Sequence, residues 1–155
     1  MNVFIAPITG LALLIAPVVA AAETLLTVTH GGTVKTYDME RLEAMGVTTI
    51  ETETIWTEGV QTFTGVPLAE LAGELGLHDG VLLASAINDY TVEIPVSDAV
   101  QGGPIIAYMA NGAAMSVRDK GPLWIVYPYD SNPDYKSELI YSRSIWQLDR
   151  IETSD

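Results

Sequence analysis

A few cations set among aromatic residues are the side chains in this sequence whose types and spacing could best bind a ligand. The chain has 7 Lys and Arg against 20 Asp and Glu, and most of these cations follow residue 117. They are Arg118, Lys120, Lys136, Arg143 and Arg150. Arginine can hold an oxyanion with two parallel hydrogen bonds, and lysine adds a point charge. A site for a small anionic ligand is therefore one interpretation of this region.

Aromatic side chains share the same third of the chain. They are Trp124, Tyr127, Tyr129, Tyr135, Tyr141 and Trp146. Flat rings of this kind can hold a planar heterocycle or an apolar ligand. If the segments that carry them are neighbours in the fold, the rings and the cations line one concave site. The alternative is that the tyrosines form the rim of a core and the cations balance nearby carboxylates. The residues alone leave both open.

The remaining reactive side chains give weaker signals. His30 lies in a Gly-rich turn and His78 follows a helix end, whereas histidine ligands usually cluster with other ligands and carboxylate partners. Glu51 and Glu53 would share one strand face, which is compatible with a calcium site but also with a solvated edge. The sequence has no cysteine, which excludes disulfides, thiol catalysis and cysteine-ligated zinc or iron–sulfur sites. We assign no catalytic and no metal-binding residue.

Composition excludes some classes of partner and indicates a location. A net charge of -13 opposes binding to nucleic acids and to anionic membrane surfaces. Residues 3–22 are apolar and uncharged, and the three alanines at 20–22 provide the small residues of a cleavage site. We expect residues 1–22 to be a secretory signal peptide, residues 23–155 to form one domain, and the protein to be periplasmic. An uncleaved membrane anchor is the alternative, because the stretch is about long enough to span a bilayer.

The expected elements indicate an α+β domain, rich in β-structure, with short peripheral helices. Hairpins are expected around Gly31-Gly32 and around Asn111-Gly112, whose residues tolerate positive φ. Helices are expected at 38–46 and 67–77, and strands at 80–100, 122–129 and 144–152. Residues 47–66 are β-prone and predict one or two exposed strands or a long loop. The polar residues 130–143 predict a loop.

Four segments then occur in an order typical of a known family: "FTGVPLAELAGELGL", "AINDYTVEIPVSDAV", "PIIAYMANGAAMSVRDKGPLWIVYP" and "RSIWQLDRIE". Through them the chain resembles the sulfite-oxidase-type oxidoreductase molybdopterin-binding domain family over about residues 25–152. The resemblance implies a compact, β-rich mixed α/β fold of β-sheets with short peripheral helices. It also implies molybdopterin as a possible cofactor, because full members hold a pterin-bound molybdenum and act on small oxo-compounds.

Three differences from the family pattern fall on its cofactor site. Catalytic members ligate the metal through a cysteine before the G-V-P-L helix, and the segment "VTTIETETIWTEGVQTFTGVPL" has none. Oxygen ligands replace a thiolate poorly on molybdenum. The family's P-L-R reads Pro122-Leu123-Trp124 here, and the lysine after its K-S-V segment is Trp146. The resemblance therefore implies a pterin-type cleft without its usual metal ligand. The residues expected around this cleft are Trp56, Asn88, Tyr90, Arg118, Lys120, Tyr129, Arg143 and Trp146.

Together these observations predict an exported, non-catalytic domain. It would bind a small anionic or heterocyclic ligand, or a periplasmic or membrane-protein partner, and it would hold no cofactor. One alternative is a genuine molybdopterin-dependent oxidoreductase whose metal has no protein thiolate. Another is a purely structural interaction module with no small-molecule site. The fold alone does not decide among them, because one fold can carry many functions.

Overall fold

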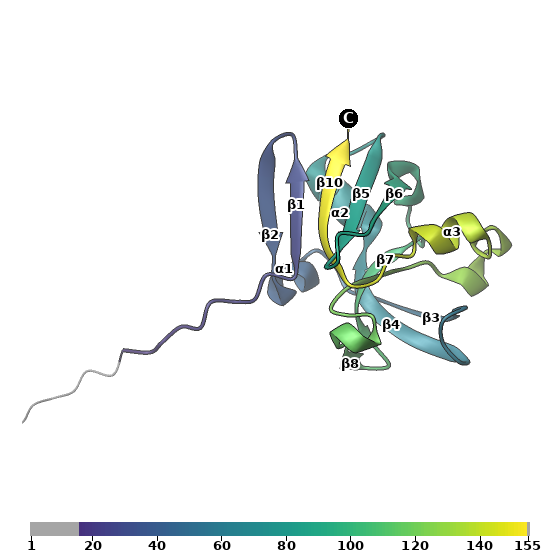
Figure 1. Cartoon of the computed structure of the whole chain (residues 1–155), viewed down its shortest axis with the longest axis horizontal. Helices are drawn as coiled ribbons and strands as arrows, with labels where there is room; N and C mark the ends of the chain where they lie inside the picture. Colours follow the sequence, from purple (N-terminus) through teal and green to yellow (C-terminus); the bar gives the residue numbers. More distant parts are fainter. Residues whose placement is uncertain (1–15, 155) are drawn as a thin grey trace, which may run out of the picture.

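Two β-sheets form the frame of the protein, and short helices lie at their margins (Figure 1). The computed structural model describes residues 16–154. The first sheet has the strand order β2-β1-β10-β5-β6, and the second has the order β3-β4-β7-β8 with β9 also paired to β7. The β-rich α+β class predicted from the sequence is confirmed.

The bounds of these elements are as follows. The strands are β1 (Leu26–His30), β2 (Thr33–Tyr37), β3 (Thr48–Glu53), β4 (Val60–Pro67), β5 (Val81–Ala86), β6 (Thr91–Pro95), β7 (Ile105–Ala110), β8 (Ala113–Ala114), β9 (Trp124–Val126) and β10 (Leu148–Ser154). The helices are α1 (Met39–Ala44), α2 (Leu68–Leu75) and α3 (Glu138–Arg143). Single 3-10 turns are η1 (Val96–Asp98), η2 (Val117–Asp119), η3 (Tyr129–Ser131) and η4 (Pro133–Tyr135).

Local sequence signals account for the first two helices. Asp38 caps α1, because its side chain accepts a hydrogen bond from the Arg41 backbone N–H at 2.9 Å. Helix α2 starts after Pro67 and ends at Gly76, which adopts the left-handed conformation with φ 70°. Helix α2 buries Leu68 and Leu71 on the face that meets the core. Both helices were predicted at these places.

The first sheet joins the two ends of the domain. Strand β1 pairs in parallel with β10, and β10 pairs antiparallel with β5. Figure 1 shows the yellow β10 between the purple β1 and the teal β5. The chain segment that leads into β10 therefore passes close to the β5–β6 turn, and this proximity matters for the site described below.

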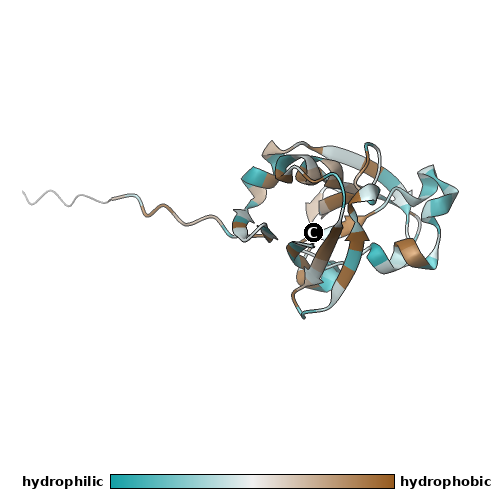
Figure 2. Cartoon of the chain, turned by 90° about the horizontal axis from the view of Figure 1, so that it is seen from above, coloured by the Kyte–Doolittle hydropathy of each residue, from teal (hydrophilic) through white to brown (hydrophobic). Residues whose placement is uncertain are grey.

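Large apolar side chains fill the interior between the elements. The fully buried ones include Trp124, Tyr127, Tyr129 and Phe63. In Figure 2 the hydrophobic stretches (brown) run along the inner strands, and the hydrophilic ones (teal) are mostly at the periphery. These buried rings contact one another: Phe63 lies 5.2 Å from Trp124, and Tyr127 lies 6.3 Å from Tyr129, between ring centroids.

The structure differs from the sequence prediction in the last third of the chain. Residues 130–143, expected to be a loop, contain α3, which begins after the cap residue Ser137. The strand expected over 122–129 is only three residues long, although all of β9 is buried. Strand β10 begins at Leu148, later than expected, because Gln147 has a positive φ of 51° that interrupts the extended chain.

The predicted signal peptide lies mostly outside the described residues. Residues 16–22 are exposed and belong to no helix or strand. Among the described helices, none has the length and apolar character needed to cross a membrane.

Candidate functional site

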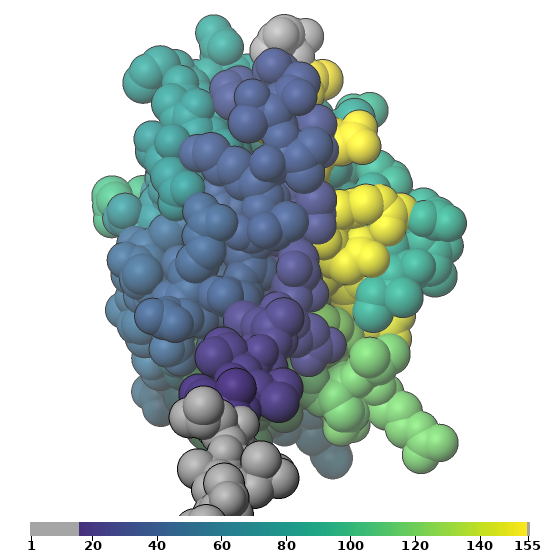
Figure 3. All heavy atoms as spheres, turned by 90° about the vertical axis from the view of Figure 1, so that its left-hand side faces the viewer, coloured from purple at the N-terminus to yellow at the C-terminus, as the bar shows by residue number. Residues whose placement is uncertain are grey.

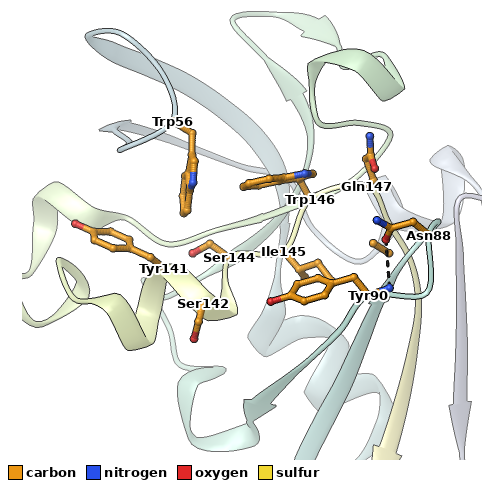
Figure 4. Close-up of a pocket in the computed structure, with 10 residues that line it drawn as sticks. Trp56, Asn88, Tyr90, Tyr141, Ser142, Ser144, Ile145, Trp146 and Gln147 are labelled. Carbon is orange, nitrogen blue, oxygen red and sulfur yellow. Dashed lines mark hydrogen bonds between the residues drawn. The ribbon is translucent and has the colours of Figure 1, made fainter.

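A cavity of about 340 Å³ opens between four separate segments of the chain. Trp56 comes from the β3–β4 loop, Asn88 and Tyr90 from the β5–β6 turn, Tyr141 from α3, and Trp146 from the segment before β10. Figure 4 shows Trp56 and Trp146 on one side of the opening, with Tyr141 and Tyr90 flanking it. The other lining residues are Ala86, Ser142, Ser144, Ile145 and Gln147. We call this cavity the aromatic pocket.

Trp56 is the centre of the aromatic cluster behind the pocket. Its ring lies edge-on to Trp146 at 5.5 Å, to Tyr141 at 5.8 Å and to Trp124 at 5.9 Å between ring centroids. Such edge-to-face pairs are the preferred geometry of aromatic side chains. The buried Trp124 supports the cluster from below, and its indole N–H donates to the Ser144 carbonyl at 3.2 Å. The rings therefore hold one another in fixed positions.

Backbone hydrogen bonds place Trp146 at the pocket. The Ile125 N–H donates to the Ile145 carbonyl, and Trp124 and Trp146 form an isolated β-bridge. On the other side, the Ile87 N–H donates to the Gln147 carbonyl at 2.9 Å. Residues 145–147 thus tie the second sheet to the β5–β6 turn of the first. Trp146 keeps 36 % of its surface exposed in this position.

The polar groups around the pocket are uncharged, since the lining contains no Asp, Glu, Lys, Arg or His. The Asn88 Oδ1 accepts from the Tyr90 backbone N–H at 3.2 Å, which leaves the amide N–H groups of Asn88 for a ligand. The Gln147 Nε2 donates to the Val117 carbonyl at 2.7 Å. The Ser144 hydroxyl is occupied, because it accepts from the Tyr129 hydroxyl and donates to the Ile140 carbonyl.

Four of the eight residues predicted to surround a cleft line the aromatic pocket. They are Trp56, Asn88, Tyr90 and Trp146. Lys120 lies beside it, with its Nζ 5.7 Å from the centre of the Trp146 ring and 5.6 Å from that of Trp124. Both distances are within the range of a cation–π interaction of the lysine with an indole ring. Tyr129 is buried behind Tyr141, at 5.7 Å between ring centroids, and burial raises the pKa of Tyr129 to about 12.

The two arginines predicted at the cleft do not line this pocket. Arg143 forms an ion pair with Asp98, in which its Nη1 donates to Oδ2 at 2.9 Å. The Tyr127 hydroxyl donates to the same oxygen at 2.8 Å. Burial and this hydrogen bond raise the pKa of Tyr127 far above its ordinary value. Arg118 is exposed on η2 and has no ion pair within residues 16–154.

Of the six rings predicted to share a concave patch, Tyr141 and Trp146 line the pocket, whereas Trp124, Tyr127 and Tyr129 are buried in the core. Three of the five predicted cations pair with carboxylates, as the alternative interpretation expected: Lys136, Arg143 and Arg150.

The sequence analysis did not name the lining residues Ser142, Ser144 and Gln147. Ser142 lies on α3, where a loop was expected, and Ser144 and Gln147 lie between α3 and β10, where a continuous strand was expected. The sequence did hold a signal for α3, because a serine before an acidic residue, here Ser137 before Glu138, is a common helix start. In the structure the Ser137 hydroxyl oxygen accepts from the Ile140 backbone N–H at 3.3 Å.

Glu51 and Glu53 lie on β3 as expected, but no third potential ligand joins them among the described residues. Glu51 is exposed on β3, and His30 Nδ1 hydrogen-bonds the Thr153 hydroxyl at 2.8 Å. Within the described range, no three side chains of His, Asp or Glu are arranged to hold a metal ion.

Comparison with known proteins gives one family match. The family model described as "Oxidoreductase molybdopterin binding domain" matches residues 21–131. No curated protein matches the chain. The matched range contains Trp56, Asn88 and Tyr90, whereas Tyr141 and Trp146 follow it. The aromatic pocket is therefore built partly from the matched segment and partly from α3 and the residues after it.

Proposed function

Because the chain belongs to the oxidoreductase molybdopterin binding domain family, we propose that its aromatic pocket binds a planar, uncharged heterocycle. One observation supports this most directly. Four aromatic side chains from separate segments surround a cavity of about 340 Å³. A pocket of that size, lined mainly by apolar and aromatic groups with a few polar ones, is typical of small-molecule sites.

The polar groups of the pocket favour a ligand that accepts hydrogen bonds. Asn88 offers its amide N–H groups, and the rings of Trp56 and Trp146 each carry an indole N–H donor. Carbonyl oxygens and ring nitrogens of a heterocycle would satisfy such donors. An anionic ligand is favoured less, because Arg143 is paired with Asp98 and Arg118 is outside the lining.

The residues present do not fit a thiolate-ligated molybdenum. The sequence has no cysteine, and the lining of the aromatic pocket offers only aromatic, amide, hydroxyl and aliphatic groups. Thiolate is a soft ligand, and none of these side chains provides one. The aromatic lining supports binding of a flat ring system. We propose that the domain binds this ligand without transforming it.

We also infer export of this domain. The apolar residues 3–22 and the alanines at 20–22 have the pattern of a signal peptide. Mass analysis of the protein recovered from separated cell fractions tests the inference. A chain that starts at Glu23 in the periplasmic fraction supports it, and a full-length chain in the membrane fraction contradicts it.

The binding experiment uses isothermal titration of the purified chain with three probes. Lumichrome and unsubstituted pterin are flat, uncharged heterocycles, whereas benzoate is a smaller anionic ring. We expect the two heterocycles to bind and benzoate not to bind. Trp146→Ala should weaken heterocycle binding by about tenfold or more, the usual loss when a stacking ring is removed. Trp146→Phe should restore most of the affinity.

Arg118→Ala is the matched control, because Arg118 is exposed and outside the pocket. Its affinity for the heterocycles should be unchanged. Binding of benzoate that depends on Arg118 would replace this proposal with the anionic one. A purified chain that carries one molybdenum atom and passes electrons to an oxo-acceptor would replace it with the oxidoreductase. Folded protein that binds none of the probes would favour a structural or protein-binding role.

A further inference from the structure

A second and larger cavity, of about 530 Å³, lies between the N-terminal segment, the start of α1 and the residues between β8 and Pro122. Figure 3 shows the purple N-terminal residues between the blue β2–α1 region and the green residues that follow β7. The cavity shares no lining residue with the aromatic pocket. We call it the acidic pocket, because three carboxylates line it: Glu23, Asp38 and Glu40.

The charge of the acidic pocket is one-sided. No Lys, Arg or His side chain lies among its lining residues. Cleavage before Glu23, as inferred above, would add one terminal ammonium at this edge and would leave the three carboxylates in excess. The cation nearest in sequence, Arg41, is directed elsewhere: it bonds the Thr36 carbonyl and lies 4.9 Å over the Tyr37 ring. Among the hydrogen bonds of the described chain, Glu23 and Glu40 side chains take part in none, and Asp38 uses one oxygen to cap α1. The carboxylates thus keep oxygens for a ligand.

The other walls of the acidic pocket are apolar. Met39 comes from α1, and Met115 and Pro122 from the segment after β8. Met115 is almost fully buried, at 8 % exposed. A ligand in this cavity would therefore place an apolar body against thioether and ring carbons and a polar group against the carboxylates. Methionine side chains adapt readily to the shape of such a body.

Tyr108 supplies an independent sign of a ligand. Its side chain is 2 % exposed and lines the acidic pocket, yet its hydroxyl makes no hydrogen bond with any of residues 16–154. No fully buried side-chain oxygen in that range lacks a partner, so this hydroxyl keeps some accessible surface, and the cavity that Tyr108 lines offers it a place to meet a ligand. Burial and the nearby Glu43 carboxylate raise the pKa of Tyr108. A buried tyrosine hydroxyl normally finds a partner.

We propose that the acidic pocket binds a primary amine carried on an apolar body. An ammonium group has three N–H donors and no acceptor, which matches the carboxylate oxygens and the Tyr108 hydroxyl oxygen. The methionines and Pro122 cover the apolar part. The amine is either a free small molecule or the lysine side chain of a peptide, and the same chemistry serves both.

The test compares three probes of one shape by isothermal titration of the purified chain. They are 2-phenylethylamine, the uncharged 2-phenylethanol and the anionic 3-phenylpropionate. The amine should bind at least about tenfold more tightly than the alcohol, because an ammonium group forms charge-assisted hydrogen bonds with carboxylates. The anion should not bind. The preference should shrink as salt screens the carboxylates. Equal binding of amine and alcohol would overturn the proposal, whatever the variants do.

Variants then locate the site. Tyr108→Phe removes only the hydroxyl, and Asp38→Asn removes a charge while it keeps the helix cap. Each should weaken amine binding by about threefold to tenfold. Glu51→Gln, an exposed carboxylate on β3, is the control and should bind as the natural chain does. Amine binding that none of the pocket variants changes would also overturn the proposal. An acetylated, amidated peptide with one lysine and no other charge distinguishes the two sources by its affinity relative to the free amine.

Discussion

Asp98 holds the helix that forms one wall of the aromatic pocket. One of its oxygens receives both the Arg143 guanidinium at 2.9 Å and the Tyr127 hydroxyl at 2.8 Å. The Arg143 and Asp98 side chains are only 18 % and 17 % exposed. Because Arg143 is the last residue of α3, this ion pair ties α3 to η1 and so fixes the helix that carries Tyr141.

Removal of the Asp98 carboxylate should therefore destabilise the fold. Asp98→Ala leaves the Arg143 charge mostly buried and without a partner, which costs roughly 3 kcal/mol, the low end for a buried pair because Arg143 keeps 18 % of its side chain exposed. The free energy of unfolding in urea measures this loss. Lys35→Ala, which removes the exposed ion pair with Glu74 at 3.6 Å, is the control and should cost less than about 1 kcal/mol. Equal losses in the two variants would show that the Asp98 pair acts as an ordinary surface pair.

At the scale of elements, a glycine in the second sheet with no room for a side chain tests how tightly that sheet is packed, and a glycine in α2 with free space beside it is the comparison. A Cβ added at Gly65 in β4 would lie 2.1 Å from the Ile106 carbonyl oxygen and 2.6 Å from the Ala107 Cα. Gly65 sits at the register shift between β4 and β7. Backbone atoms of a neighbouring strand cannot move aside without loss of pairing, so Gly65→Ala should cost about 3 kcal/mol, the upper end for overpacking.

Gly73→Ala is the matched substitution. Gly73 lies within α2, and an added Cβ there meets nothing within 4 Å. Alanine is the better helix former, and the change should stabilise the protein by about 0.5–1 kcal/mol. Urea unfolding of both variants measures the two effects, provided that the dependence of the unfolding free energy on urea concentration stays the same. A mild effect of Gly65→Ala would mean that β4 and β7 can shift register.

Sequence reasoning succeeded where the signal for an element is local. The turn at Asn111-Gly112 joins β7 and β8 with positive φ at both residues, as predicted. It failed at α3, which buries only Ile140 and ends at Ser144 without a glycine, whereas the equally short α1 has both a cap at Asp38 and a glycine at 46 just after its end. An apolar stripe needs a longer helix to become visible in the sequence. Strand β9 has only three residues, although the apolar run around it is longer. The run predicts burial, but it does not show how many of its residues form backbone hydrogen bonds with β7.

The same limit applies to the candidate site. The sequence indicated Trp56 and Trp146 through the family resemblance, and the structure brings both to one pocket. The pairing of Arg143 with Asp98 joins residues far apart in the chain, and no local pattern predicts it. The positive φ at Gln147 likewise follows from bonds to two other segments, where Gln147 N–H donates to the Lys120 carbonyl and its carbonyl accepts from Ile87.

At the scale of the whole molecule, buried tyrosines make stability depend on alkaline pH. Burial raises the pKa of Tyr129 to about 12, against an ordinary value of 10.0, and the pKa of Tyr127 is raised further. The unfolded chain releases these protons near pH 10, whereas the folded chain keeps them. Above that pH the unfolded state binds fewer protons than the folded state, so the free energy of unfolding must fall as pH rises.

We expect the free energy of unfolding to show no loss from these tyrosines below about pH 9 and to fall above about pH 10, by up to about 1.4 kcal/mol per pH unit for each buried tyrosine. Urea unfolding at a series of pH values measures the slope. Tyr129→Phe should make the slope shallower by about 1.4 kcal/mol per pH unit, the effect of one proton, because it removes one ionising group from the unfolded state. Any contribution of the lysines to the slope is the same in both proteins. The absorbance of tyrosinate in the folded chain, measured as pH rises, provides a second test. Ionisation of all seven tyrosines near pH 10 would contradict the prediction, because it would mean that water enters the aromatic core and that the pocket above it is not rigid.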